Sequence, residues 1–91
     1  MHYLICYDIS ENKIRRKVVN FLESVALRVQ YSVFTCDVSD RQIRSVKNEL
    51  TILTAKSKHA LLLITPICHD CYSNLWKKGD FLEEPETLVI V

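Results

Sequence analysis

Residues 3–38 read YLICYDISENKIRRKVVNFLESVALRVQYSVFTCDV, and the spacing of apolar side chains changes twice along this stretch. Residues 3–7 are continuously apolar and rich in strand formers, which predicts a strand buried on both faces that ends at Asp8. Apolar residues then recur at helical spacing, at Ile14, Val18, Phe21, Leu22 and Val25. The stretch therefore predicts a strand followed by an amphipathic helix, with Ser10 placed to cap the helix.

Residues 27–38, LRVQYSVFTCDV, alternate with a period of two but change phase near Val33. Either a bulge bends one long strand at this point, or two short strands meet at a tight corner. We favour two strands. Tyr31 and Phe34 flank the phase change, where they either pack at a subunit interface or line a site.

The second half of the chain repeats the alternation of helix and strand. Residues 39–42 read S-D-R-Q, a capping box, and a second amphipathic helix follows, with apolar positions at Ile43, Val46, Leu50 and Leu53. Residues 59–65, HALLLIT, predict a buried strand that Pro66 stops, with a polar, irregular segment after it. Residues 87–91, TLVIV, need a sheet edge to pair with.

This order of elements predicts an α+β fold, a ferredoxin-like split β-α-β sandwich with two helices on one sheet face. Residues 1–91 form a single domain, because this length supports one core. The C-terminal strand is expected to pair with a partner subunit, since roughly 20 residues after Pro66 can reach across a two-fold axis. Residues 67–91 are then a dimerisation segment, anchored by Trp76 and Phe81.

Charge is distributed unevenly along the chain. The net charge is +1 at pH 7, but residues 1–58 carry +4 and residues 59–91 carry −3. The basic surface therefore belongs to the first part. The sequence has no basic-then-apolar leader and no apolar run of about 20 residues, which predicts a cytoplasmic protein without a membrane partner.

Four cysteines are expected to be mostly reduced in that compartment. Cys6 and Cys36 lie in apolar strands and are expected to be small core residues. Cys68 and Cys71 form a lone C-x-x-C pair, and zinc is disfavoured there because structural zinc takes four ligands and no second pair follows. A redox motif would be expected at a helix start in a thioredoxin-like order, so an ordinary loop thiol pair is favoured.

The segments YLICYDIS, KIRRKVVNFLE, LRVQYSVFTCDVS and LLLITPIC together resemble the CRISPR-associated protein two family, the small subunit of the spacer-adaptation machinery, over residues 1–71. This resemblance implies a homodimer to which a C-terminal strand contributes. It also implies a metal-dependent endonuclease on RNA or DNA, and a bridge between dimers of the integrase, CRISPR-associated protein one. Two positions depart from the family pattern: Ala26 stands where glycine is usual, and Thr35 where an acidic residue is usual.

Asp8 is the candidate catalytic residue and metal ligand. Its carboxylate can hold Mg²⁺, or Mn²⁺, while nearby cations hold phosphate; the candidates are Lys13, Arg15, Arg16 and Arg28. One aspartate supplies too few ligands, so the metal site is expected at a dimer axis that brings together the Asp8 of both subunits. Otherwise Asp8 is a helix cap and the cations form a solvated face. The resemblance favours the functional role.

Two functions of different classes follow from the resemblance. One is Mg²⁺-dependent hydrolysis of single-stranded RNA or of DNA, with Asp8 at the metal. The other is a non-catalytic adaptor that binds double-stranded DNA and spaces two integrase dimers. An RNA-cleaving toxin of the same fold is a third, weaker possibility. No general base is evident, because His2, His59 and His69 qualify only by residue type, and His2 and His59 are expected far from the tip of the first strand.

Overall fold

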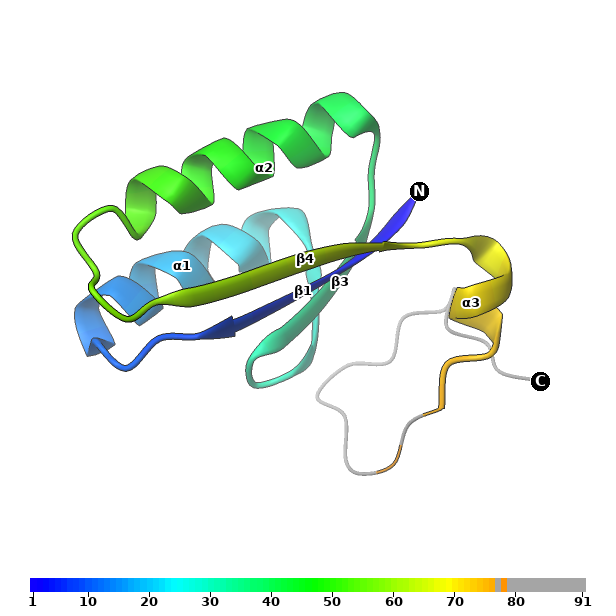
Figure 1. Cartoon of the computed structure of the whole chain (residues 1–91), viewed down its shortest axis with the longest axis horizontal. Helices are drawn as coiled ribbons and strands as arrows, with labels where there is room; N and C mark the ends of the chain where they lie inside the picture. Colours follow the sequence, from blue (N-terminus) through cyan, green and yellow to red (C-terminus); the bar gives the residue numbers. More distant parts are fainter. Residues whose placement is uncertain (77, 79–91) are drawn as a thin grey trace.

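The computed structural model describes residues 1–76 and residue 78. The elements follow in the order β1 (His2–Asp8), α1 (Asn12–Val25), β2 (Leu27–Gln30), β3 (Val33–Asp37), α2 (Asp40–Leu53), β4 (Leu61–Ile67) and α3 (His69–Ser73). The strands form one antiparallel sheet in the order β2-β3-β1-β4, and α1 and α2 lie over one side of it (Figure 1). This is the ferredoxin-like arrangement, so the predicted fold class is confirmed.

The core lies between β1 at the centre of the sheet and the two helices. Tyr3, Ile5 and Tyr7 are buried on the side that faces the helices, whereas Leu4 and Cys6 are half-buried on the other side. Burial of β1 on both faces was predicted from its continuous apolar run, and in this chain it holds fully for one face only. The reason is that α1 and α2 cover the same side of the sheet.

The two long helices start in different ways. At α2 the capping box is present, because the Gln42 backbone N–H donates to Ser39 Oγ at 3.2 Å and the Ser39 N–H donates to Gln42 Oε1 at 2.9 Å. At α1 the N-cap residue is Glu11, and no side chain caps the helix. The prediction that Ser10 caps α1 is therefore wrong, since the chain enters the helix one residue later.

Both features considered for residues 27–38 occur together. β2 and β3 are separate strands joined at Tyr31 and Ser32, which confirms the prediction of two strands. The register between them also shifts between Arg28 and Gln30, which is a bulge in β2. Phe34 is fully buried in the core, whereas Tyr31 is exposed at the turn.

β4 differs from its prediction at both ends and in its burial. It begins at Leu61 and continues through Pro66 to Ile67. Proline is tolerated because β4 is an edge strand, in which every second backbone N–H faces away from the sheet. Leu61 and Leu63 are exposed, so the expected buried strand is buried on one side at most.

The segment after β4 is helical where an irregular segment was predicted. Tyr72 of α3 is buried and its ring stacks on His2 at a centroid distance of 4.3 Å. Trp76, predicted to be an anchor, is 81% exposed. Phe81 and the predicted strand at residues 87–91 lie outside the described residues, so the dimerisation segment 67–91 stays a prediction. Within the described part of the chain, no helix is long and apolar enough to cross a membrane.

Candidate functional site

Asp8 is the last residue of β1, and its register partner is Leu61 at the start of β4. Its side chain is exposed. Among the residues that the structure describes, none forms a hydrogen bond or an ion pair with its carboxylate, and α1 has no side-chain cap. The capping role considered for Asp8 is therefore not observed, and no described residue occupies its carboxylate oxygens.

A cleft of about 570 Å³ opens beside Asp8. Its lining comes from the end of β1 and the loop after it, the first turn of α1, β2 and the β2–β3 turn: Tyr7, Asp8, Ile9, Arg15, Arg28, Tyr31 and Ser32. The fold thus brings Asp8 together with Arg15 and Arg28, two of the four cations proposed from the sequence. An anionic ligand in this cleft would meet one carboxylate and two guanidinium groups.

Arg15 holds the loop that follows Asp8. Its guanidinium donates to the carbonyl oxygens of Ile9 at 3.1 Å and Ser10 at 3.5 Å, and it also bonds Asn12 Oδ1. These contacts occupy part of a donor fork that carries five N–H groups. Arg15 therefore fixes the loop geometry next to Asp8 and retains donors for a phosphate.

Arg28 is held even more firmly. Its Nε and Nη2 donate to the Tyr31 carbonyl oxygen at 3.2 and 3.0 Å, and its guanidinium carbon lies 5.6 Å from the centre of the Phe34 ring. Tyr7 donates its hydroxyl to the same carbonyl at 2.7 Å. An ion pair with Glu23 at 3.7 Å is half-exposed and contributes little. Arg28 is thus first of all a structural residue of the β2–β3 turn.

Lys13 and Arg16 lie outside this cleft. Both are exposed on α1, and neither has a hydrogen bond or ion pair from its side chain within residues 1–76. Helical geometry separates them from Arg15, because consecutive residues point about 100° apart. The four proposed cations therefore divide into two groups: Arg15 and Arg28 in the cleft, and Lys13 and Arg16 on the outer helix surface.

The donor set at Asp8 fits an open metal site rather than a closed cage. In the described part of the chain, no three His, Cys, Asp or Glu side chains are grouped to hold a metal ion. Mg²⁺ does not need such a group, because it commonly binds through one or two carboxylates together with water and substrate phosphate. Mn²⁺ accepts the same oxygen ligands. Asp8, exposed and without a partner among the described residues, lies in a cleft that also holds two guanidinium groups and is compatible with this mode of binding.

His59 lies nearer to Asp8 than the sequence suggested. It precedes β4 by two residues, and β4 runs antiparallel to β1, so the start of β4 lies beside the end of β1. His59 also contributes to lowering the pKa of Glu11, which is the N-cap of α1. The expectation that His59 is far from the strand tip is therefore wrong. It holds for His2, which lies at the opposite end of β1.

Glu11 joins two loops at this end of the sheet. Ser57 Oγ donates to both carboxylate oxygens of Glu11, at 2.8 and 2.9 Å. This hydrogen bond, with the backbone N–H of Lys58 among the smaller causes, lowers the pKa of the Glu11 carboxyl. The carboxylate of Glu11 thus fastens the loop before β4 to the loop after Asp8. Sequence reasoning missed it, since the contact spans 46 residues.

The Cys68–Cys71 pair lies at the start of α3 rather than in a loop. The Cys71 backbone N–H donates to Cys68 Sγ at 3.4 Å, and both thiols are exposed. Hydrogen bonds from Cys71 lower the pKa of Cys68, and the same interaction raises the pKa of Cys71. Burial raises the pKa of Cys6 and Cys36. Cys36 is a core residue as predicted, whereas the same prediction for Cys6 is wrong, because Cys6 is half-buried on the side of the sheet away from α1 and α2.

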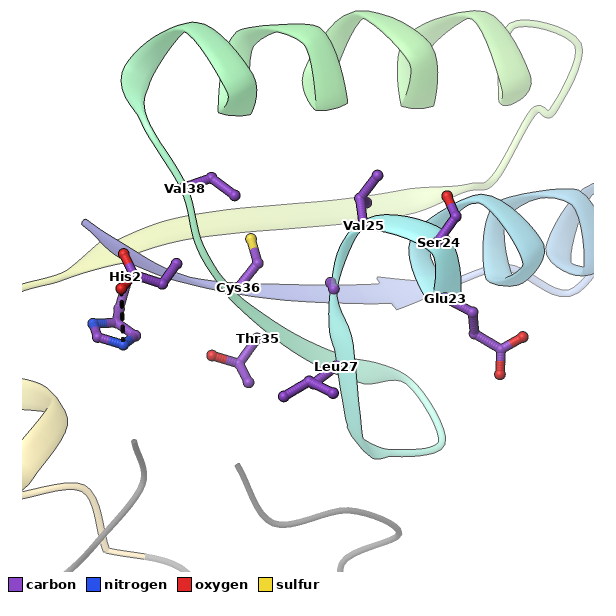
Figure 2. Close-up of a pocket in the computed structure, with 10 residues that line it drawn as sticks. His2, Glu23, Ser24, Val25, Leu27, Thr35, Cys36 and Val38 are labelled. Atoms are coloured by element: carbon purple, nitrogen blue, oxygen red, sulfur yellow. Dashed lines mark ion pairs between the residues drawn. The ribbon is translucent and has the colours of Figure 1, made fainter. Parts of the chain in front are cut away.

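A second hollow, of about 440 Å³, lies where α1 passes into β2 (Figure 2). Ala26 and Thr35, the two departures from the family pattern, both line it. Thr35 is 3% exposed, and its Oγ1 has no hydrogen-bond partner among the described residues. Its register partner on β1 is Leu4, four residues from Asp8, or about 13 Å along the strand. Neither Ala26 nor Thr35 lines the Asp8 cleft of the same chain.

Comparisons with known proteins agree with this fold and with the resemblance seen in the sequence. The family model of CRISPR associated protein Cas2 matches residues 1–75. A Chloroflexus aurantiacus protein named CRISPR-associated endoribonuclease Cas2 1 is 35% identical over 80 residues, covering 88% of this chain and 86% of its own. A Synechocystis protein named CRISPR-associated endoribonuclease Cas2 2 is 29% identical over 97% of both chains. The crystal structure of Streptococcus pyogenes Cas2 superposes with a TM-score of 0.75 over 87% of this chain and 100% of that one; at 24% identity, this supports the fold.

Proposed function

Since the chain belongs to the Cas2 family of CRISPR-associated proteins, we propose that it acts in spacer adaptation as a homodimeric, Mg²⁺-dependent endonuclease on RNA or DNA. One observation carries the proposal: the Asp8 carboxylate, which has no partner in the described part of the chain, lies in the same cleft as two guanidinium groups that the fold holds in place. Relatives that carry the name endoribonuclease support the same reaction class.

Exposed apolar side chains on the side of the sheet away from α1 and α2 support the homodimer. Leu61 and Leu63 on the edge strand β4 are exposed, as is Leu27 on the other edge strand, β2. Both helices lie over the opposite side of the sheet (Figure 1). Exposed apolar side chains on an open sheet face are typical of association surfaces. A second copy docked on this face is the expected partner, with Asp8 of each subunit near the common axis.

The residues of the cleft would divide the chemistry between them. Asp8 would hold the cation with its free carboxylate oxygens, while the remaining donors of Arg15 and Arg28 would bind and orient the phosphate. When bound, Mg²⁺ or Mn²⁺ supplies Lewis-acid stabilisation of the charge that develops on the phosphate. The arginine contacts to the turn and to the loop keep these donors oriented before the substrate arrives.

The test is cleavage of a single-stranded RNA and a duplex DNA by the purified protein, in Mg²⁺ and in EDTA. Asp8→Asn keeps the shape of the side chain and removes its charge, and we expect cleavage to fall by about 100-fold or more. Asp70→Asn is the matched control, since Asp70 is an exposed carboxylate on α3 beyond the opposite end of β1. It should cut at the wild-type rate. Equal cutting by wild type and Asp8→Asn would refute the catalytic role.

The adaptor function is the alternative, and exposed cations favour it. Beyond Lys13 and Arg16, the outer surface of α2 exposes Arg41, Arg44 and Lys47, whose side chains have no ion pair within residues 1–76. Contacts from such residues to the DNA backbone give sequence-independent, salt-sensitive binding. In this function the dimer would bridge two dimers of the integrase, CRISPR-associated protein one. Wild type that binds duplex without cutting it, with Asp8→Asn binding equally well, would establish the adaptor.

A further inference from the structure

Tyr31 combines a fixed backbone with an uncovered ring. Its carbonyl oxygen accepts three hydrogen bonds, from the Tyr7 hydroxyl at 2.7 Å and from the Nη2 and Nε of Arg28 at 3.0 and 3.2 Å. The next residue is also held, since Ser32 accepts a hydrogen bond at its carbonyl from the Tyr7 backbone N–H at 3.1 Å. Tyr31 as a whole, by contrast, is 69% exposed, and it lines the Asp8 cleft.

This combination points to a ligand rather than to packing. A large aromatic side chain at a turn is normally covered or mobile, because an exposed ring gains nothing from burial. Here the hydroxyl of Tyr7 and the Arg28 fork fix the backbone carbonyl of the residue from which the ring projects. The other aromatic residue that flanks the phase change, Phe34, is fully buried in the core and cannot take this role.

We propose that the Tyr31 ring is a stacking platform for an unpaired base next to the phosphate bound at Asp8, and that it makes the cleft selective for single-stranded nucleic acid. This inference rests on the proposed function in one respect, namely that the cleft receives a nucleic acid. Every base has a π-face, so stacking on Tyr31 would be independent of sequence. Bases within a duplex are already stacked on their neighbours and cannot reach the ring.

The experiment measures binding, so it does not depend on catalysis. Fluorescence anisotropy measures the affinity for a labelled single-stranded RNA and, separately, for a labelled duplex DNA. All variants carry Asp8→Asn, and the buffer contains EDTA. Tyr31→Phe keeps a ring, whereas Tyr31→Leu keeps apolar bulk without one. Trp76→Leu is the matched control, because it removes another exposed aromatic ring that lies outside the cleft.

We expect Tyr31→Leu to weaken binding of the single strand by about 5- to 150-fold, the range found for loss of one base–aromatic stack. Duplex binding should be unchanged, and Tyr31→Phe and Trp76→Leu should bind both probes as the background does. Equal single-strand affinity in Tyr31→Leu would overturn the inference, as would an equal loss for both probes.

Sedimentation velocity tests whether a second subunit covers the ring instead. If Tyr31→Leu becomes monomeric at a concentration at which Tyr31→Phe stays dimeric, the ring is an interface residue and the inference fails. Failure of the proposed function would show in a different experiment, the cleavage assay, in which Asp8→Asn would then cut as well as the wild type. The two results are therefore independent, since stacking on Tyr31 is measured without metal and without turnover.

Discussion

Two residues that donate to one carbonyl should be energetically coupled, and the Tyr31 carbonyl provides the test. Tyr7→Phe removes the hydroxyl that donates at 2.7 Å, and Arg28→Met removes the guanidinium that donates at 3.0 and 3.2 Å. Methionine retains much of the apolar stem next to Phe34. Each single change leaves the carbonyl with a donor, whereas the double change leaves it with none of these three.

The hydrogen bonds set the expected magnitudes. Tyr7→Phe should lower the free energy of unfolding by about 1 kcal/mol, the usual net value of one hydrogen bond. Arg28→Met should lower it by about 1.5 kcal/mol, because the donor is charged and its side chain is only 27% exposed. The double variant should lose about 1 kcal/mol more than the sum, since a partly buried carbonyl is then left without its donors.

Urea denaturation, followed by far-UV circular dichroism, measures the free energy of unfolding of the wild type, the two single variants and the double variant. The protein concentration is held constant, because the stability of a dimer depends on it. Tryptophan fluorescence is a poor reporter here, since Trp76 is 81% exposed in the folded protein. The Tyr7→Phe change alone should lower Tm by about 4–8 °C.

Additive losses would refute this reasoning, provided that the denaturant slope is the same for the four proteins. They would mean that solvent satisfies the carbonyl equally well, and that the three donors do not hold Tyr31 in place. Tyr31→Leu serves as the control, because it changes an exposed ring and leaves the backbone carbonyl intact. It should unfold within about 0.5 kcal/mol of the wild type.

Two further predictions concern titrating groups. The hydrogen bond from Ser57 lowers the pKa of Glu11 in the folded state, so its stabilisation is complete above the ordinary glutamate pKa and is lost as pH falls through the lowered value. Glu11→Gln should therefore show a smaller fall in Tm between neutral pH and about pH 3 than the wild type, and an identical fall would contradict this. Cys68, whose pKa is lowered by Cys71, should be alkylated by iodoacetamide faster than Cys71 near neutral pH in the reduced protein. Peptide mass spectrometry measures both rates, and equal rates would contradict the assigned geometry.

Local signals in the sequence were sufficient for the elements from β1 to β4 and for their order, but not for α3, where an irregular segment was predicted. The capping box at Ser39 and Gln42 and the apolar stripes of α1 and α2 involve residues at most a few turns apart, so short-range hydrogen bonding and periodicity specify them. The position of Asp8 at a strand end follows from the same reasoning. Local signals were weaker at boundaries, where Ser10 was predicted to cap α1 and the helix instead has Glu11 at its N-cap.

Long-range pairing decided the composition of the site. Arg28 and Asp8 are 20 positions apart, and they share a cleft because β3 pairs with β1 and carries the β2–β3 turn to the end of β1. The same antiparallel pairing of β4 with β1 brings His59 to the side of Asp8, against expectation from strand order alone. It also places Pro66 on an edge strand, where proline does not interrupt the sheet.

The sequence by itself thus determined the α+β class, the two long helices with the capping box of α2, and the presence of a carboxylate at a strand tip followed by cations. Only the tertiary structure decided which cations accompany that carboxylate, and that Arg15 and Arg28 serve the loops as well as the cleft. It also decided that Phe34 is buried while the ring of Tyr31 stays exposed. The physical reason is that helix and strand periodicity arise from neighbours along the chain, whereas a site is formed by side chains whose proximity depends on strand register.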